Sequence, residues 1–154
     1  METVPDEGLA GVWREQAPRL WRALVAYTGE PAVASDALGE AFAQAVARGS
    51  ELHAPERWVW KAAFRIAAGE LKERGRHIPE TDRPMLDSTE EAAELLEALH
   101  KLPSKQRAVL VLHYYAGYKA REIAEILGPS AATVRVHLSA GRKRLRQLME
   151  TDDD

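Results

Sequence analysis

The sequence predicts an all-α protein built from two small helical domains that are joined by a flexible linker. Apolar residues recur every three or four positions along most of the chain, which is the repeat of amphipathic helices. One stretch, residues 76–88, breaks this repeat with two prolines and no periodicity. The 154 residues, 45% of them hydrophobic, suffice for two small cores. We expect a first domain at residues 9–76, a linker at 77–91, a second domain at 92–149 and an acidic tail at 150–154.

The first domain is expected to contain helices over residues 18–28, 31–48 and 55–74. Pro18 suits the first position of a helix and Gly29 its end, and an earlier turn over residues 9–16 could extend this helix. Gly49 and Gly75 stop the other two helices. The apolar residues expected in the core are Leu20, Leu24, Val25, Tyr27, Val33, Ala37, Leu38, Ala41, Phe42, Ala45, Val46, Val59, Ala62, Ala63 and Ile66.

The third helix carries a basic stripe. At about 100° per residue, five cations fall in one arc about 100° wide. Trp60 and Phe64 border this arc, and Trp58 lies at its other margin. Cations can follow phosphates while aromatic rings stack on unpaired bases, so the stripe suits single-stranded nucleic acid. An ordinary amphipathic helix with half-buried aromatics explains the same pattern. The five cations are Arg57, Lys61, Arg65, Lys72 and Arg76.

The second domain is expected to contain helices over residues 89–101, 104–115, 119–127 and 131–149. Ser104 can cap the second of these helices, and Gly117 ends it. Gly128, Pro129 and Ser130 form a tight turn, in which Ser130 is a good N-cap for the last helix.

Residues 119–149 thus form a helix, a tight turn and a second helix, the arrangement of a DNA-binding helix-turn-helix. Ala124 is small where the two helices cross. The last helix has a buried stripe, formed by Val134, Leu138, Gly141, Leu145 and Leu148. The face expected to meet DNA has no acidic residue, and Arg135 on it could reach guanine edges in the major groove. The residues expected to contact DNA in this module are Lys119, Arg121, Ser130, Ala131, Ala132, Thr133, Arg135, Val136, Ser139, Arg142, Lys143, Arg144 and Arg146.

The charge distribution supports this interpretation. Residues 99–149 hold ten basic and two acidic residues, a net charge of +8. Residues 1–98 hold 11 basic and 18 acidic residues, a net charge of −7, and the tail adds −4, which together give the −3 of the whole chain. The four basic residues from 142 to 146 would hold phosphates without reading sequence. The alternative is a basic helical hairpin that binds protein or has no partner.

Other classes of function are disfavoured. The chain has no cysteine, so it can form neither a disulfide nor a thiolate metal site. It shows no phosphate-cradling glycine loop and no nucleophile elbow, and we expect neither an enzyme nor a cofactor. The acidic N-terminus is no secretory signal, and no apolar run reaches membrane-spanning length, so we expect a cytoplasmic protein. The histidines, none of which pair at metal-ligand spacing, are His53, His77, His100, His113 and His137.

Residues 102–149 resemble region four of the sigma-70 family of bacterial RNA polymerase sigma factors, most closely its extracytoplasmic-function group. The resemblance implies that the last helix reads the upstream, minus-thirty-five promoter element. Lys119 departs from the small polar residue usual at the start of the short helix, which weakens its N-cap. The matching residues are Leu102-Pro103, Arg107, Glu122-Ile123-Ala124, Leu127-Gly128, Thr133-Val134 and Leu145-Arg146.

The first half resembles region two of the same family. Within residues 13–49, three residues match the family's acidic helix, which implies that Asp36, Glu40 and Phe42 contact the polymerase clamp. The spacing of Asp36 and Glu40 alone is typical of two acidic residues on a solvated helix face. Residues 55–76 resemble the promoter-melting and minus-ten segment. Trp58, Val59, Trp60 and Lys61 match the family's aromatic and basic run. Together with the basic stripe, this resemblance predicts DNA contacts by Arg57, Trp58, Trp60, Lys61, Phe64, Arg65 and Lys72. Gly39, Arg65 and Gly69 depart from the residues usual in the family.

The resemblance therefore predicts a sigma factor with two partners, core RNA polymerase and promoter DNA. The polymerase contacts would be the clamp of the beta-prime subunit and the flap of the beta subunit. An anti-sigma factor is a candidate third partner. The alternative is a stand-alone helix-turn-helix regulator that binds DNA without polymerase and uses its N-terminal half for ligand binding or dimerisation.

Overall fold

The computed structural model describes residues 4–74 and 89–151, and every regular element in these two ranges is helical, as predicted. The chain divides into two compact units, residues 1–80 and 81–154. Most of the expected linker and most of the acidic tail lie outside the described residues. No helix in the described ranges is both long and apolar enough to cross a membrane.

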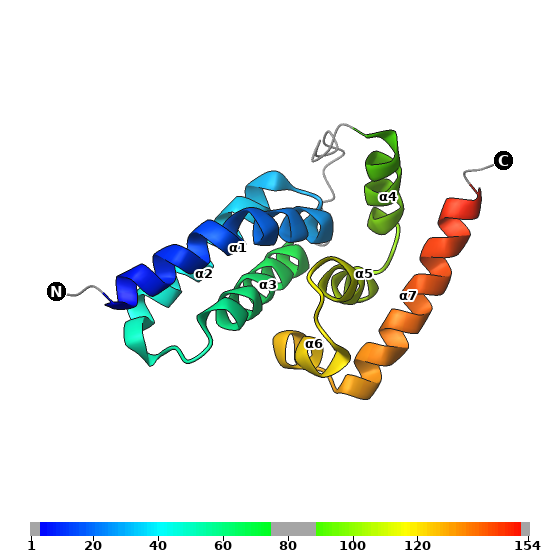
Figure 1. Cartoon of the computed structure of the whole chain (residues 1–154). Coiled ribbons are helices and arrows are strands. Elements are labelled where there is room, and N and C mark those ends of the chain that lie inside the picture. Colours follow the sequence, from blue (N-terminus) through cyan, green and yellow to red (C-terminus); the bar gives the residue numbers. More distant parts are fainter. Residues whose placement is uncertain (1–3, 75–88, 152–154) are drawn as a thin grey trace. The chain divides into compact units, whose positions relative to one another are not determined.

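The N-terminal unit consists of three helices, α1 (Val4–Thr28), α2 (Pro31–Arg48) and α3 (Pro55–Glu73), with a short 3-10 turn, η1 (Gly49–Glu51). They lie side by side, and α1 packs against both α2 and α3 (Figure 1). The start and end of α2 agree with the prediction, with Pro31 in its first turn and Gly49 following at a φ of 57°.

The first helix begins well before Pro18, which lies inside α1, so the predicted helix start is wrong. Proline in a helix interior removes one backbone hydrogen bond and costs about 3 kcal/mol. Core packing on both sides of it offsets this cost, because Gln16 and Ala17 before it and Leu20 and Leu24 after it are all buried.

Trp60 and Phe64 lie inside the core, so their predicted place at the border of the basic arc is wrong. Neither residue has any exposed surface. The Phe64 ring stacks on Tyr27 with 5.2 Å between centroids, and the Trp60 indole donates a hydrogen bond to Gln16 Oε1 at 2.9 Å. Two large rings on one side of α3 are needed to fill the space between α1 and α2, because many of the other buried residues there are alanines.

The helical repeat also predicts Val46 in the core, and this prediction is wrong, because the residue is 61% exposed. The buried arc of α2 runs from Val33 to Phe42 and spans about 180° at 100° per residue. Val46 falls about 40° outside that arc. The other predicted core residues of α2 are buried.

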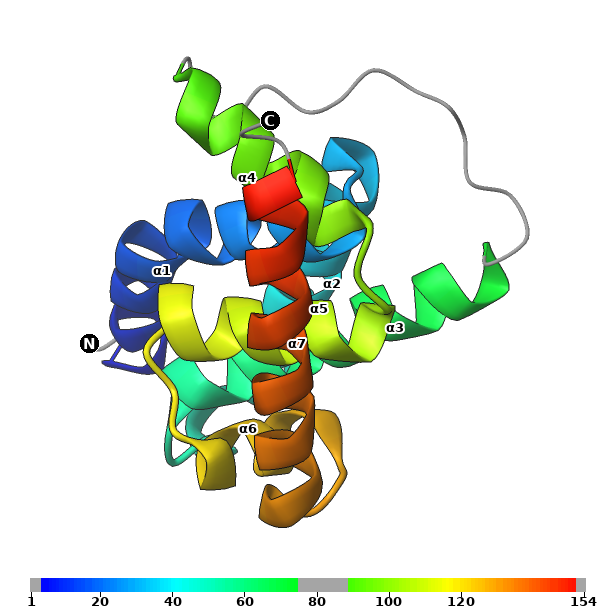
Figure 2. The ribbon, with the colours of Figure 1, turned by 90° about the vertical axis from the view of Figure 1, so that its right-hand side faces the viewer.

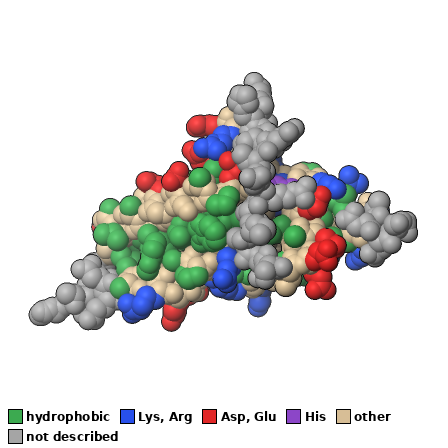
Figure 3. Space-filling model, turned by 90° about the horizontal axis from the view of Figure 1, so that it is seen from above, with side chains coloured by type: hydrophobic (Ala, Val, Ile, Leu, Met, Phe, Trp, Pro, Cys, Tyr) green, Lys and Arg blue, Asp and Glu red, His purple; other side chains and the backbone are tan. Residues whose placement is uncertain are grey.

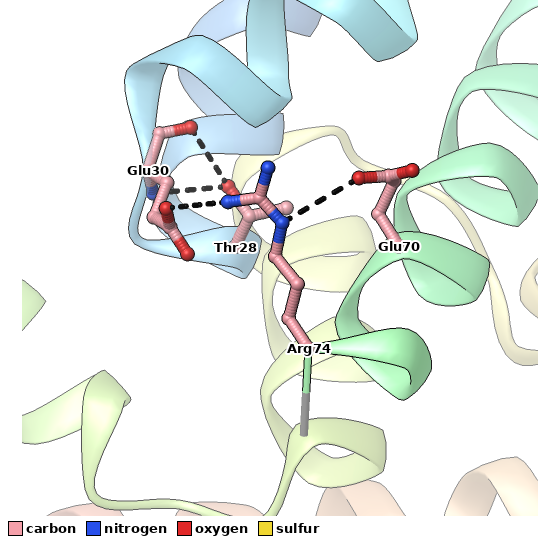
Figure 4. A network of polar contacts seen from close by, with 4 residues as sticks. All are labelled: Thr28, Glu30, Glu70 and Arg74. Carbon is pink, nitrogen blue, oxygen red and sulfur yellow. Dashed lines mark hydrogen bonds and ion pairs between the residues drawn. The ribbon is translucent and has the colours of Figure 1, made fainter. Parts of the chain in front are cut away.

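A polar network joins the end of α3 to the turn between α1 and α2 (Figure 4). The Arg74 guanidinium lies 3.0 Å from a Glu30 carboxylate oxygen and 3.6 Å from one of Glu70. The Glu30 amide in turn donates to Thr28 Oγ1 at 3.1 Å. These groups are partly exposed, so each ion pair contributes at most about 1 kcal/mol.

The C-terminal unit consists of α4 (Glu90–His100), α5 (Ser104–Leu110), a π-helical turn η2 (Val111–Tyr115), α6 (Ala120–Leu127) and α7 (Ala131–Thr151). The long α7 packs against α4, α5 and α6 (Figure 2). Thr89 caps α4, because its Oγ1 accepts the Ala92 amide at 3.1 Å. The helix thus begins two residues before the expected start of the second domain.

Ser104 does not cap α5, which contradicts the prediction. Pro103 occupies the N-cap position and Ser104 is the first helical residue. The turn before α5 is stabilised by Arg107, which is buried and donates a hydrogen bond to the Leu102 carbonyl at 3.0 Å. The sequence had indicated α-helix to Tyr115, but the Ala116 amide donates to the Val111 carbonyl at 3.1 Å, a spacing of five residues that defines the π-turn.

The predicted stripe on α7 faces the core. Val134, Leu138 and Gly141 are buried, and Leu145 and Leu148 are half-buried. A Cβ added at Gly141 would lie 3.1 Å from Leu110 Cδ1, so this glycine lets α7 approach α5 closely.

Candidate nucleic-acid interface

The turn between α6 and α7 has the geometry that the sequence predicts. Gly128 adopts a φ of 105°, and its amide donates to the Ala124 carbonyl at 2.8 Å. A residue with a side chain is strained in this conformation. Ser130 Oγ then accepts the Thr133 amide at 3.1 Å, which caps α7. The turn therefore fixes the direction in which α7 leaves α6.

The start of α6 is only partly capped. The Lys119 amide donates to Glu122 Oε1 at 2.8 Å, which forms one half of a capping box. A lysine side chain has donors and no acceptor, so it cannot complete the other half. This agrees with the weak N-cap expected from the sequence.

The face of α7 that points away from the core is exposed and basic. Ala131, at the N-terminus of α7, is half-buried. The helix carries no acidic residue before Glu150, so a polyanion meets no repulsive side chain on α7 before that point. Exposed side chains of the predicted set are Lys119, Arg121, Ser130, Ala132, Thr133, Arg135, Val136, Ser139, Arg142, Lys143, Arg144 and Arg146.

Arg142 has a partner that sequence reasoning missed. Its Nη1 donates to the hydroxyl oxygen of Tyr114 at 2.8 Å, and 59% of Tyr114 is exposed. Tyr114 lies in η2, where the π-turn shifts the helical register. Periodicity alone could not place this side chain, because a helical wheel assumes a constant angle per residue.

The cations of α3 reach the surface to different extents. Arg57, Arg65 and Lys72 are exposed, while Lys61 is half-buried, and Arg76 lies outside the described residues. With Trp60 and Phe64 in the core, Trp58 is the aromatic residue of α3 that retains surface. Its ring is half-buried and lies 5.3 Å from the Arg48 guanidinium carbon.

The acidic helix α2 presents Asp36 and Glu40 one turn apart, and both are exposed. Phe42, the third residue of the predicted polymerase contact, is 7% exposed. Its ring packs edge-on against Trp13 at 4.8 Å, and Trp13 is 45% exposed. Hydrophobic side chains gather over the α1–α2 part of this unit (Figure 3). Phe42 is thus mostly covered, and Trp13 is the more exposed ring of this pair.

Within residues 4–74 and 89–151, no group of three or more His, Asp or Glu residues is arranged to hold a metal ion. Each unit thus presents its own candidate surfaces: the C-terminal unit has the basic face of α7, and the N-terminal unit has the basic residues of α3 and the acidic residues of α2.

Comparison with known proteins identifies relatives of this chain. The sequence profile of sigma-70, region 4, matches residues 92–145. A probable RNA polymerase sigma factor, RfaY, of Xanthomonas campestris is 29% identical over 150 residues, which cover 84% of this chain and 37% of that protein. The chain thus spans well under half the length of this relative. The ECF RNA polymerase sigma factor SigL of Mycobacterium tuberculosis is 27% identical over 161 residues, covering 92% of this chain and 89% of SigL.

A solved structure shares the fold. The sigma factor RpoE, crystallised in complex with the anti-sigma factor NepR from Bartonella quintana, matches with a TM-score of 0.79 at 19% identity. The match covers 98% of this chain and 99% of that one. The helix-turn-helix, the region 4 profile and the sigma-factor relatives lead to one conclusion: the chain belongs to the extracytoplasmic-function group of the sigma-70 family of RNA polymerase sigma factors.

Proposed function

We propose that this protein binds core RNA polymerase and directs it to promoters, and that the polymerase, not this chain, performs the catalysis. The observation that carries the proposal is α7, a capped recognition helix whose outward face is exposed and has no acidic residue before its last turn. Such a helix fits the major groove, where its N-terminal residues reach base edges.

Within α7, some residues would contact base edges and others would contact phosphates. Arg135 lies in the second turn and is exposed, so its guanidinium can meet the O6 and N7 atoms of guanine. Arg142, Lys143, Arg144 and Arg146 lie farther along the helix and are exposed, which suits contacts with phosphates. Affinity would then come mainly from the C-terminal half of α7, and base preference from its N-terminal half.

The N-terminal unit would contact the polymerase and the downstream promoter DNA. Exposed Arg57 and Arg65 can hold phosphates of the separated strand, and Trp58 keeps a ring surface on which a base can stack. Asp36 and Glu40 on α2 would meet the polymerase clamp, since both carboxylates are exposed and one turn apart. The N-terminal unit would thus contact the polymerase through α2 and promoter DNA through α3.

An anti-sigma factor would regulate the protein, and the cytoplasm would be its place of action. Support for such a regulator comes from the RpoE structure, which was solved with the anti-sigma factor NepR. Co-purification of the protein from cells in several growth states tests this, because the proposal expects a small protein partner in at least one state.

Reconstitution tests the proposed function. The protein is mixed with bacterial core RNA polymerase, co-elution is followed, and transcripts from a genomic library are sequenced. The proposal predicts stable co-elution and initiation at a shared promoter motif. DNA binding by the protein alone, with no binding to core, would instead support a stand-alone regulator.

A charge-reversed variant tests the polymerase face. Asp36→Lys combined with Glu40→Lys should weaken co-elution with core at least tenfold, because both exposed carboxylates are lost. Glu15→Lys, on the exposed surface of α1, is the matched control and should co-elute like the wild type. Equal behaviour of both variants would show that α2 does not provide the contact.

A further inference from the structure

Val136 is a hydrophobic side chain displayed to solvent on the basic face of α7. It is 64% exposed, more than the other large hydrophobic side chains exposed in the described residues, such as Val46 at 61% and Tyr114 at 59%. It lies in the second turn of α7, which begins at Ala131. A β-branched side chain in a helix is nearly fixed in one rotamer, so its two methyl groups point in a defined direction.

Val136 is the centre of an apolar strip. Ala132 precedes it by four residues and Ala140 follows it by four, and all three are exposed. Residues four apart lie above one another on a helix, and the strip is about 12 Å long at 1.5 Å per residue. Exposed Arg135, Ser139 and Lys143 lie beside it. The methyl groups of these three residues therefore form an apolar strip along a face of α7 that also carries cations.

The charged residues around this apolar strip indicate which kind of partner binds it. Lysine and alanine are depleted in protein–protein interfaces, whereas this strip contains two alanines and has Lys143 two turns from its centre, with the cation of Arg135 beside it. A polyanion that also offers apolar groups fits both features. Duplex DNA is such a partner, because thymine places its 5-methyl group in the major groove, where alanine, threonine and similar side chains contact it.

We propose that Val136, together with Ala132, is a specificity determinant that contacts the 5-methyl group of thymine in the upstream promoter element. Thymine is then preferred over cytosine at the base pair that Val136 faces, next to the position that Arg135 reads. The inference rests on the proposed function and deepens it, because it names the base chemistry that α7 selects. Removing a buried methyl contact should lower affinity about fourfold.

Deoxyuridine gives a test that changes only this methyl group. A set of promoter duplexes is made in which each upstream thymine is replaced, one at a time, by deoxyuridine. Affinity is measured for the reconstituted holoenzyme and, in parallel, for the protein alone. For the wild type, one replacement should lower affinity about fourfold. Val136→Ser should bind the thymine and deoxyuridine duplexes equally well at that position.

Leu95→Ser is the control variant, because Leu95 is 41% exposed on α4 of the same unit. It should keep the full fourfold sensitivity. Because Val136 is exposed, the serine variant should fold normally, which circular dichroism verifies.

Two results would overturn the inference. One is a wild type that discriminates against deoxyuridine at no upstream position, and the other is a Val136→Ser variant that still discriminates as strongly as the wild type. If Val136→Ser changed only co-elution with core, the strip would be a protein contact and the inference would also fail. A protein that does not bind core refutes the proposed function instead, and the duplex series with the free protein still judges the role of Val136.

Discussion

The guanidinium of Arg142 and the phenol of Tyr114 are joined by a hydrogen bond of 2.8 Å between α7 and the π-turn η2. Both side chains are exposed at the edge of the candidate DNA face. A guanidinium has five N–H donors, so Arg142 can contact a phosphate while it holds Tyr114. The tyrosine thereby limits the directions that the arginine can take before DNA arrives.

Tyr114→Phe should lower the affinity of the holoenzyme for promoter DNA about fivefold, because loss of the hydrogen bond that orients Arg142 costs roughly 1 kcal/mol. The dependence of affinity on salt should stay the same, since no charge is lost. Arg142→Gln should instead reduce the slope of log affinity against log salt concentration by about one. Titrations at several salt concentrations measure both quantities, and an unchanged affinity in Tyr114→Phe would show that the bond does not position Arg142.

The N-cap of α7 should contribute measurably to stability. Ser130→Ala removes the acceptor of the Thr133 amide, and we expect the free energy of unfolding to fall by about 1 kcal/mol. Ser139→Ala makes the same chemical change on an exposed helical position and should have little effect. Urea unfolding followed by circular dichroism compares the two. Equal effects would mean that the cap contributes nothing.

Replacement of Gly141 by alanine should destabilise the C-terminal unit, although glycine-to-alanine changes usually stabilise helices. Alanine is better than glycine in a helix interior by about 1 kcal/mol. At Gly141, however, the new Cβ would meet Leu110 Cδ1 at 3.1 Å and Gln106 Cβ at 3.4 Å, and the Leu110 side chain is buried and has little room to move away. We expect Gly141→Ala to destabilise the C-terminal unit by about 1 kcal/mol or more.

Gly39→Ala provides the control, because a Cβ at this exposed position in α2 would meet nothing within 4 Å. It should raise the stability of the N-terminal unit by about 1 kcal/mol. All four tryptophans lie in that unit, so their fluorescence reports its unfolding separately. A stabilising Gly141→Ala would contradict the close packing of α7 on α5.

The two tryptophans of α3 should have different roles. Trp60→Phe leaves Gln16 Oε1 without its indole donor and opens a void in the core, so it should destabilise the N-terminal unit by about 2 kcal/mol. Trp58→Ala should instead impair promoter opening, because Trp58 offers a partly exposed ring. Permanganate modification of unpaired thymines measures opening. A Trp60→Phe variant that stays folded but no longer opens promoters would contradict the placement of Trp60 as a core residue.

Much of the helical framework could be predicted because its signals are local. Proline and glycine mark both ends of α2, and Gly128 and Ser130 mark the turn before α7. The buried stripe of α7 follows from the helical repeat alone. The exposed positions of the candidate DNA face follow from the same repeat, since residues that do not pack against α5 and α6 must face outward.

The failures arise where tertiary contacts outweigh local preference. Pro18 normally begins a helix, but core packing on both sides of it keeps α1 continuous. Aromatic residues beside cations suggest a nucleic-acid surface, yet Trp60 and Phe64 are needed to fill a core in which alanine is the commonest residue. Tyr114 was missed because the π-turn changes the angle between successive residues.

Footprinting of one promoter by three samples tests the central claim most directly. The samples are the protein alone, core polymerase alone and the two combined, on a promoter identified by library transcription. The proposal predicts protection of both the upstream and the downstream element by the combined sample only. With Arg135→Ala the upstream footprint should remain, but it should lose its preference at one upstream base pair. The same upstream footprint from the protein alone would contradict it and identify the chain as a regulator that acts without polymerase.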